Sequence, residues 1–193
     1  MNGYPTIEEA EALLQEAESR NPGLWWNHSR ITARCAEKIA VAAGMDREQA
    51  YVLGLLHDIG RRFGIRHLGH VSDGYRYMTE LGYPAVARIC LTHSFNLPTL
   101  DVYVGKRDIT PEQQGEIQTL LDGIQYDDFD RLIQLCDCLA GTEGVMDMEA
   151  RMADVKRRYG FYPQEKWDAN LKLKRYFEEK AGKDIYEIVG KPV

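Results

Sequence analysis

The chain has 193 residues, of which 44% are hydrophobic and 28% are charged, and its formal net charge is −6. This length and composition are ordinary for one globular domain with a sizeable core, and they exclude a largely disordered chain. The acidic balance argues against a nucleic-acid partner, and the apolar runs are too short to cross a bilayer. The start of the chain does not read as a secretory signal, so we expect a cytoplasmic protein without a membrane partner.

Helical signals dominate from the N-terminus onward, and strand-like alternation is nearly absent. Thr6 and Glu9 form a capping-box pattern that predicts a helix to Ser19. The next helix is expected from about residue 25 or 27 to 43, before Gly44, and a third runs from an Asp46 cap up to His57. Further helices are expected over 72–81, 84–93, 110–122, 128–140, 146–159 and 163–181, with a short one after Asp184. The sequence therefore predicts an all-α bundle.

Residues 94–109 are the one long stretch without a helical pattern. A loop of that length in a compact domain is often a lid or a binding edge. The alternative is a surface connection that contains a short ordered turn. The sequence leaves both open.

The four cysteines show no CxxC pair. Cys136 and Cys138 form a CxC that could bind a soft metal, but both lie in an apolar helical stretch. We favour small buried thiols, as expected in a reducing compartment.

Three polar side chains lie on apolar faces of predicted helices. His28, His93 and Asp137 each stand at helical spacing with apolar residues of their own helix. These neighbours are Ile31, Cys35 and Ile39 for His28, Val86, Ile89 and Cys90 for His93, and Ile133, Cys136 and Leu139 for Asp137. A fourth helix ends in the doublet His57 and Asp58.

An ionised carboxylate directed into a core must be paired or must coordinate a metal. Arg30, Arg61 or Arg62 could supply a pairing cation from another helix. The alternative is a metal centre, because imidazoles and carboxylates in one cluster suit Zn, Fe, Mn or Ni.

The order of these residues resembles the HD superfamily of metal-dependent phosphohydrolases, whose pattern is a His, an adjacent His-Asp, and a distant Asp. His28, the His57–Asp58 doublet of "LLHDIG", and Asp137 of "LIQLCDCLAG" match that pattern over residues 25 to 142. The resemblance implies an HD-type bundle in a single domain, 1–193. Its metal-site core would be about 25–142, with the C-terminal helices 143–193 packing on it.

Some HD families hold a second metal through two more histidines. "HVSDGYRYM" places His70 four residues before Gly74, and "ICLTHS" supplies His93, so the chain resembles the dinuclear class. His67 is the rival to His70, which we favour because its spacing to the glycine matches the family. Two features depart from the pattern: Ser94 follows His93 where some dinuclear families double the histidine, and the gap to Asp137 is unusually long.

The resemblance implies that His28, His57, Asp58 and Asp137 hold one metal, while Asp58 bridges to a second held by His70 and His93. We expect Fe or Mn first, with Zn or Ni as alternatives, and we place His57 and Asp58 at the catalytic centre. The implied reaction is hydrolysis of a phosphate ester or anhydride in a nucleotide or other small phosphorylated metabolite by a metal-activated water. Arg61, Arg62 and His67 are the expected substrate-binding residues.

Two other functions fit the same ligands: an HD-fold di-iron oxygenase, and a non-catalytic, metal-braced module that senses a ligand. Residues from 143 onward match no functional motif. "MEARMADVKRRYGF" is interpreted as a packing helix with a solvated basic face.

Overall fold

The computed structural model describes residues 3–193, in which there are ten α-helices, two short 3-10 helices and no β-strand. The predicted all-α fold is confirmed. The helices are α1 (Ile7–Arg20), α2 (Trp25–Ala42), α3 (Arg47–Leu56), η1 (Ile59–Phe63), α4 (Gly69–Glu80), α5 (Pro84–Thr92), η2 (Leu100–Val102), α6 (Pro111–Asp122), α7 (Asp128–Leu139), α8 (Met148–Tyr159), α9 (Gln164–Ala181) and α10 (Ile185–Val189). None of the helices in this range combines the length and the hydropathy needed to span a membrane.

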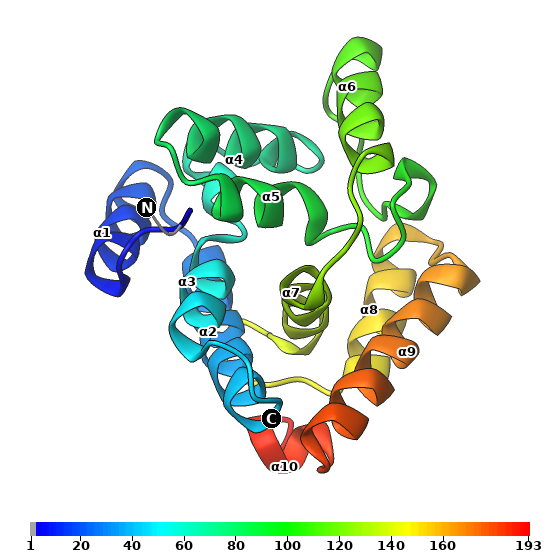
Figure 1. Ribbon diagram of the computed structural model, residues 1–193. Coiled ribbons are helices and arrows are strands. Elements are labelled where there is room, and N and C mark those ends of the chain that lie inside the picture. The colour runs from blue at the N-terminus through cyan, green and yellow to red at the C-terminus, as the bar shows by residue number, and fades with distance from the viewer. Residues whose placement is uncertain (1–2) are drawn as a thin grey trace.

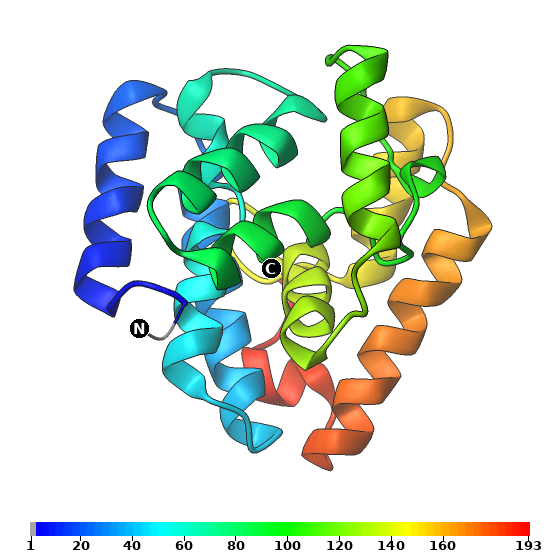
Figure 2. The same ribbon diagram turned by 45° about the horizontal axis from the view of Figure 1, so that its top comes forward.

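Helix α7 is the centre of the bundle. In Figures 1 and 2 it lies between α2 and α3 on one side and α8 and α9 on the other, with α5 nearby, and it contacts all five. Its sequence explains this position, because Leu132, Ile133, Leu135, Cys136 and Leu139 are all fully buried. A helix with so much buried apolar surface is stabilised by neighbours on several sides.

The C-terminal helices share the main hydrophobic cluster with α2, α3 and α7. Leu173 and Phe177 of α9 and Ile185 and Val189 of α10 belong to the same cluster as the apolar faces of those helices. The segment after residue 142 is therefore packed against the elements that precede it.

A second, smaller cluster occupies the stretch between His93 and Asp137. Phe95, Val102 and Leu121 pack there with Leu68 and Val71 of the α4 region. The long gap noted in the sequence thus contains η2 and α6, which build their own apolar contacts.

Helix α4 begins at Gly69, three residues earlier than the prediction, so His70 lies in its first turn. The reason is a carboxylate distant in sequence: the N–H groups of His67 and Gly69 each donate to Asp108, at 2.8 Å. An acidic side chain at a helix start satisfies free N–H groups and favours the helix dipole. The segment 94–109 thus provides the carboxylate that accepts from the start of α4, and it contains the short helix η2.

Candidate metal centre

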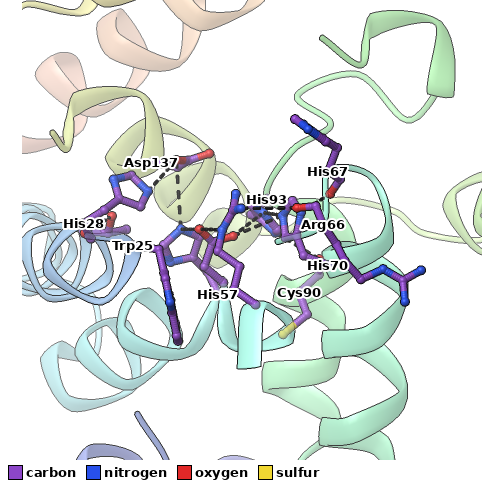
Figure 3. A network of polar contacts seen from close by, with 12 residues as sticks. Trp25, His28, His57, Arg66, His67, His70, Cys90, His93 and Asp137 are labelled. Carbon is purple, nitrogen blue, oxygen red and sulfur yellow. Dashed lines mark hydrogen bonds and ion pairs between the residues drawn. The ribbon is translucent and has the colours of Figure 1, made fainter. Parts of the chain in front are cut away.

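Six polar side chains converge at the centre of the bundle (Figure 3). Three belong to α2, α4 and α7, two follow the end of α3, and one follows the end of α5. They form two groups, and the potential ligand atoms of each group lie within 4.8 Å of one another. The first group is His28, His57 and Asp137, and the second is Asp58, His70 and His93.

In the first group, Asp137 lies between two imidazoles. Its Oδ1 is 3.0 Å from His28 Nε2 and 4.0 Å from His57 Nε2. His57 Nε2 is also 3.9 Å from Asp58 Oδ2, so the two groups adjoin at the doublet.

In the second group, Asp58 Oδ1 faces two imidazoles. It lies 3.1 Å from His70 Nε2 and 3.5 Å from His93 Nε2, and these two nitrogens are 3.1 Å apart. The structure thus brings His70 into the group rather than its rival His67. The ring of His67 extends away from the other imidazoles in Figure 3. His67 acts through its backbone instead, because its N–H donates to Asp108 and its carbonyl accepts at His70 Nδ1.

All four clustered histidines share one hydrogen-bonding pattern. Each Nδ1 is within hydrogen-bonding distance of a backbone carbonyl: Ala140 for His28, Gly54 for His57, His67 for His70, and Ile89 and Cys90 for His93. A carbonyl only accepts, so the neutral ring carries its proton on Nδ1 and keeps the Nε2 lone pair for the cluster. Orientation of a ligand imidazole by a backbone carbonyl is a common second-shell arrangement in metal sites.

Two buried atoms at the junction of the groups lack a hydrogen-bond partner among the described residues: His57 Nε2 and Asp58 Oδ1. A buried polar atom without a partner costs about 1–3 kcal/mol. Coordination to a cation would satisfy a lone pair on each, and the donor set of imidazole nitrogens and carboxylate oxygens suits divalent transition metals. The residues present therefore fit a metal centre.

The pKa shifts of His57, His70 and the two carboxyl groups agree with this use. His93 differs, because burial would lower its pKa but its contact with Asp58 and the nearby acidic charges raise it. Burial lowers the pKa of His57 to about 4, which keeps its ring neutral. Burial alone would raise the pKa of Asp58, but Arg61 and His70 outweigh it and hold that pKa well below its ordinary value. Burial would likewise raise the pKa of Asp137, whereas its neighbours His28, His57 and His93 together lower it more. Neutral imidazoles beside ionised carboxylates are the form in which these residues bind metals.

Gly60 of the "HDIG" stretch explains how His70 reaches Asp58. A Cβ on Gly60 would lie 2.0 Å from the carbonyl oxygen of His70 and 2.6 Å from the nitrogen of Gly74. Only glycine permits this approach of η1 to α4. Gly54 has a similar role, because a Cβ there would lie 2.8 Å from Cα of Ala33 in α2.

A buried ion pair ties together the helices that carry His93 and Asp137. Asp130 of α7 is fully buried, accepts from Arg88 Nε at 3.0 Å and Nη2 at 2.5 Å, and accepts from the Thr92 hydroxyl at 2.8 Å. Such a bidentate contact fixes geometry as well as adding stability. It holds α5 and α7 in the register that the cluster needs.

The two arginines after the doublet have different positions. Arg61 Nε donates to Asp58 Oδ2 at 2.6 Å, which leaves Asp58 Oδ1 facing the histidines. Arg62 points elsewhere: it bonds Glu16 at 2.5 Å and lies 4.0 Å from the ring centroid of Tyr77. The expected substrate contact of Arg62 is therefore corrected, because its guanidinium is committed to α1 and α4.

Two cations that the sequence analysis missed lie beside the cluster. Arg151 Nη2 of α8 is 3.8 Å from Asp137 Oδ1, and Lys166 Nζ of α9 donates to the Ser94 carbonyl at 2.8 Å. Arg151 was assigned to a solvated basic face. Neither Cys136 nor Cys138 belongs to either potential metal-binding group of the described residues.

An all-α bundle with two adjoining groups of His and Asp side chains defines a class of metal-binding helical proteins. The HD domain family model matches residues 25–142, more than half of the chain, so the protein belongs to the HD domain family. It is therefore an HD-domain metal-dependent phosphohydrolase. Among solved structures it is similar to the HD domain of the L. monocytogenes phosphodiesterase PgpH, with 17% identity, a TM-score of 0.48, and coverage of 86% of this chain and 97% of that chain. A comparison with curated proteins finds no match.

Proposed function

We propose that this protein hydrolyses a phosphate ester or anhydride of a small phosphorylated metabolite, with nucleotides among the candidates. The observation that carries the proposal is the pair of adjoining groups with every Nε2 directed inward. Four imidazoles held in one tautomer by backbone carbonyls are preorganised for ligation, which reduces the reorganisation on metal binding.

We assign His28, His57, Asp58 and Asp137 to one divalent ion and Asp58, His70 and His93 to a second. Asp58 is the proposed shared ligand, because its carboxylate faces both groups. Fe or Mn is our first choice and Zn or Ni the alternative, since mixed nitrogen and oxygen ligands suit all four. When bound, such ions supply a Lewis acid and a water of lowered pKa.

The protein's own residues have three tasks in this proposal. The carbonyls at the Nδ1 atoms fix the imidazoles, and Arg61 holds one oxygen of Asp58 so that the other faces the histidines. Arg61 keeps about a third of its side chain exposed beside Asp58, so we retain it as a contact for a phosphoryl oxygen. We assign His67 to positioning His70 through its carbonyl and not to contacting substrate.

We further propose that the chain acts as one domain in the cytoplasm. The shared core of the N- and C-terminal helices supports the first point. Four free cysteines, as expected in a reducing compartment, support the second.

The test is elemental analysis of anaerobically purified protein, followed by a screen for phosphate release from phosphorylated metabolites. We expect about two transition-metal ions per chain and release that a chelator abolishes. Asp58→Asn, which keeps shape but removes the charge, is the matched variant and should lose both. Protein that binds no metal and releases no phosphate from any compound would contradict the proposal.

The same preparation separates the two alternatives. Hydrolysis at equal rates with and without oxygen supports the proposal, whereas oxygen consumption with an organic substrate indicates the di-iron oxygenase. Tight nucleotide binding without turnover indicates the sensing module.

A further inference from the structure

A cavity of about 140 Å³ opens beside His93 and Asp137, one proposed ligand from each group. Much of its wall comes from α8, α9 and the turn between them, including Arg151, Tyr162 and Lys166. These residues lie outside the stretch that matches the HD family, 25–142. The space next to the metal centre is thus bounded in part by a segment that lies outside this match.

The two cations of this wall flank the two ligands. Arg151 lies 3.8 Å from Asp137, with a quarter of its side chain exposed. Lys166 donates to the carbonyl of Ser94, the residue that follows His93. A neutral carbonyl does not cancel the charge of an ammonium group, so Lys166 keeps its attraction for an anion.

The charges around the centre are unequal before any metal is counted. Asp58 and Asp137 supply two negative charges, against the positive charges of Arg61, Arg151 and Lys166. Arg61 is bonded to Asp58, which leaves the cavity with more positive charge than Asp137 offsets. Bound divalent ions would enlarge that excess, so the cavity favours a ligand with more negative charge than one phosphoryl group carries.

The cavity is also small. Pockets that enclose drug-sized ligands have about 300–1,000 Å³, whereas this one has about 140 Å³. Polar side chains such as Asn96, Gln134 and Asn170 contribute to its lining, which suits a compact polar molecule.

We infer that Arg151 and Lys166 form a subsite for a second anionic group of the substrate, so that the substrate class is a compact phosphorylated metabolite carrying a further phosphate or carboxylate. This rests on the proposed phosphohydrolase function and narrows it. The subsite makes the C-terminal helices α8 and α9 the specificity-determining part of the chain.

The test measures binding to metal-loaded protein by calorimetry with three non-hydrolysable probes. Methylphosphonate carries one anionic group, methylenediphosphonate carries a second phosphonate, and phosphonoacetate carries a carboxylate instead. The variants are Arg151→Met and Lys166→Met. Matched controls on the same helices are Arg157→Met, whose side chain is 81% exposed, and the exposed Lys172→Met.

We expect the wild type to bind at least one two-anion probe about 10-fold or more tighter than methylphosphonate, because charge-assisted hydrogen bonds are strong. The probe whose affinity exceeds that of methylphosphonate identifies the second anionic group of the substrate as a phosphate or a carboxylate. In each of the two cavity variants, Arg151→Met and Lys166→Met, the ratio of the affinity for that probe to the affinity for methylphosphonate should fall about 10-fold. The two control variants should keep the wild-type ratio. Preference that survives in both cavity variants reflects chelation by the metals alone and would overturn the inference, as would equal affinity for all three probes in the wild type.

Metal content and hydrolysis of an aryl phosphate are measured on every protein. A wild type with metal and turnover but no preference refutes only the subsite. A wild type that binds no metal and releases no phosphate from the aryl phosphate or from any compound of the metabolite screen refutes the proposed function. Arg151 is near Asp137, so Arg151→Met could lower metal content. In that event Lys166→Met decides the result, and Lys166→Arg should restore the preference.

Discussion

Gly60 offers the sharpest single test of how the two groups are assembled. In Gly60→Ala the new Cβ would lie 2.0 Å from the His70 carbonyl oxygen and 2.6 Å from the Gly74 nitrogen. Both are backbone atoms in the first turns of α4, so no side chain can move aside to relieve the clash. The two segments must separate, and α4 carries His70 with it.

The expected cost follows from this geometry. Overpacking a buried site by one methyl costs about 1–3 kcal/mol, and a clash with backbone on two sides belongs at the upper end. We therefore expect Gly60→Ala to lower the free energy of unfolding by about 3 kcal/mol. Because His70 moves with α4, bound metal should also fall from about two ions per chain to about one.

Urea unfolding of the metal-free protein and elemental analysis of the purified protein measure the two effects. Gly115→Ala is the matched control, since no atom lies within 4 Å of the Cβ position in that exposed turn of α6. This control should stabilise the protein by about 0.5–1 kcal/mol. If Gly60→Ala unfolds at the wild-type urea concentration and keeps its metal, the close approach of η1 to α4 does not hold the second group together.

Four further predictions concern the centre and its surroundings. Asp58→Ala should abolish both metal binding and phosphate release, because it removes the proposed shared ligand; retained metal by elemental analysis would refute the assignment. His70→Ala should reduce bound metal from about two ions to about one, while His67→Ala keeps the wild-type content because its contribution is a backbone carbonyl. Arg62→Met should cost about 1 kcal/mol in urea unfolding, because it removes an ion pair and a contact with an aromatic ring, yet leave kcat/KM unchanged. Chelator-treated protein should lose stability as the pH falls from 6.5 towards 4, because unfolded His57 gains a proton there while the buried ring has a pKa of about 4; equal urea midpoints at pH 7 and pH 5 would contradict this.

The inward direction of His28, His93 and Asp137 could be predicted from local signals, whereas the places of His57, Asp58 and His70 in the two groups came from the resemblance to the HD superfamily. His28 and His93 stand in phase with apolar residues of their own helices, and a polar group on such a face requires a partner. The choice between His67 and His70 depended on where α4 begins. That start is fixed by Asp108, about forty residues away in sequence, which no local pattern relates to this helix.

The cations of the cavity were missed although the same signal was present. Arg151 stands three residues after the buried Met148 and one before the buried Met152. Lys166 stands four, seven and eleven residues before Asn170, Leu173 and Phe177, which are all buried. The spacing of these two cations relative to buried residues of their own helices therefore distinguishes them from exposed cations such as Arg157. The direction of the Arg62 side chain could not be predicted from its own helix. Its partners lie on α1 and α4, and the packing of η1 against both helices determines where it points.

His57 and Asp58 can each serve one of the two adjoining groups because the helix type changes where they stand. Neighbouring side chains in an α-helix project about 100° apart, which would direct only one of them at a shared site. Here α3 ends at Leu56, His57 keeps helical angles, and Asp58 takes φ −102° and ψ 13°, outside the α-helical basin, before the 3-10 helix η1 begins. The break directs His57 to the first group and Asp58 Oδ1 to the second, while Asp58 Oδ2 stays within 3.9 Å of His57 Nε2. Gly60 must then come two residues later, because the turn that redirects Asp58 also brings η1 against the backbone of α4.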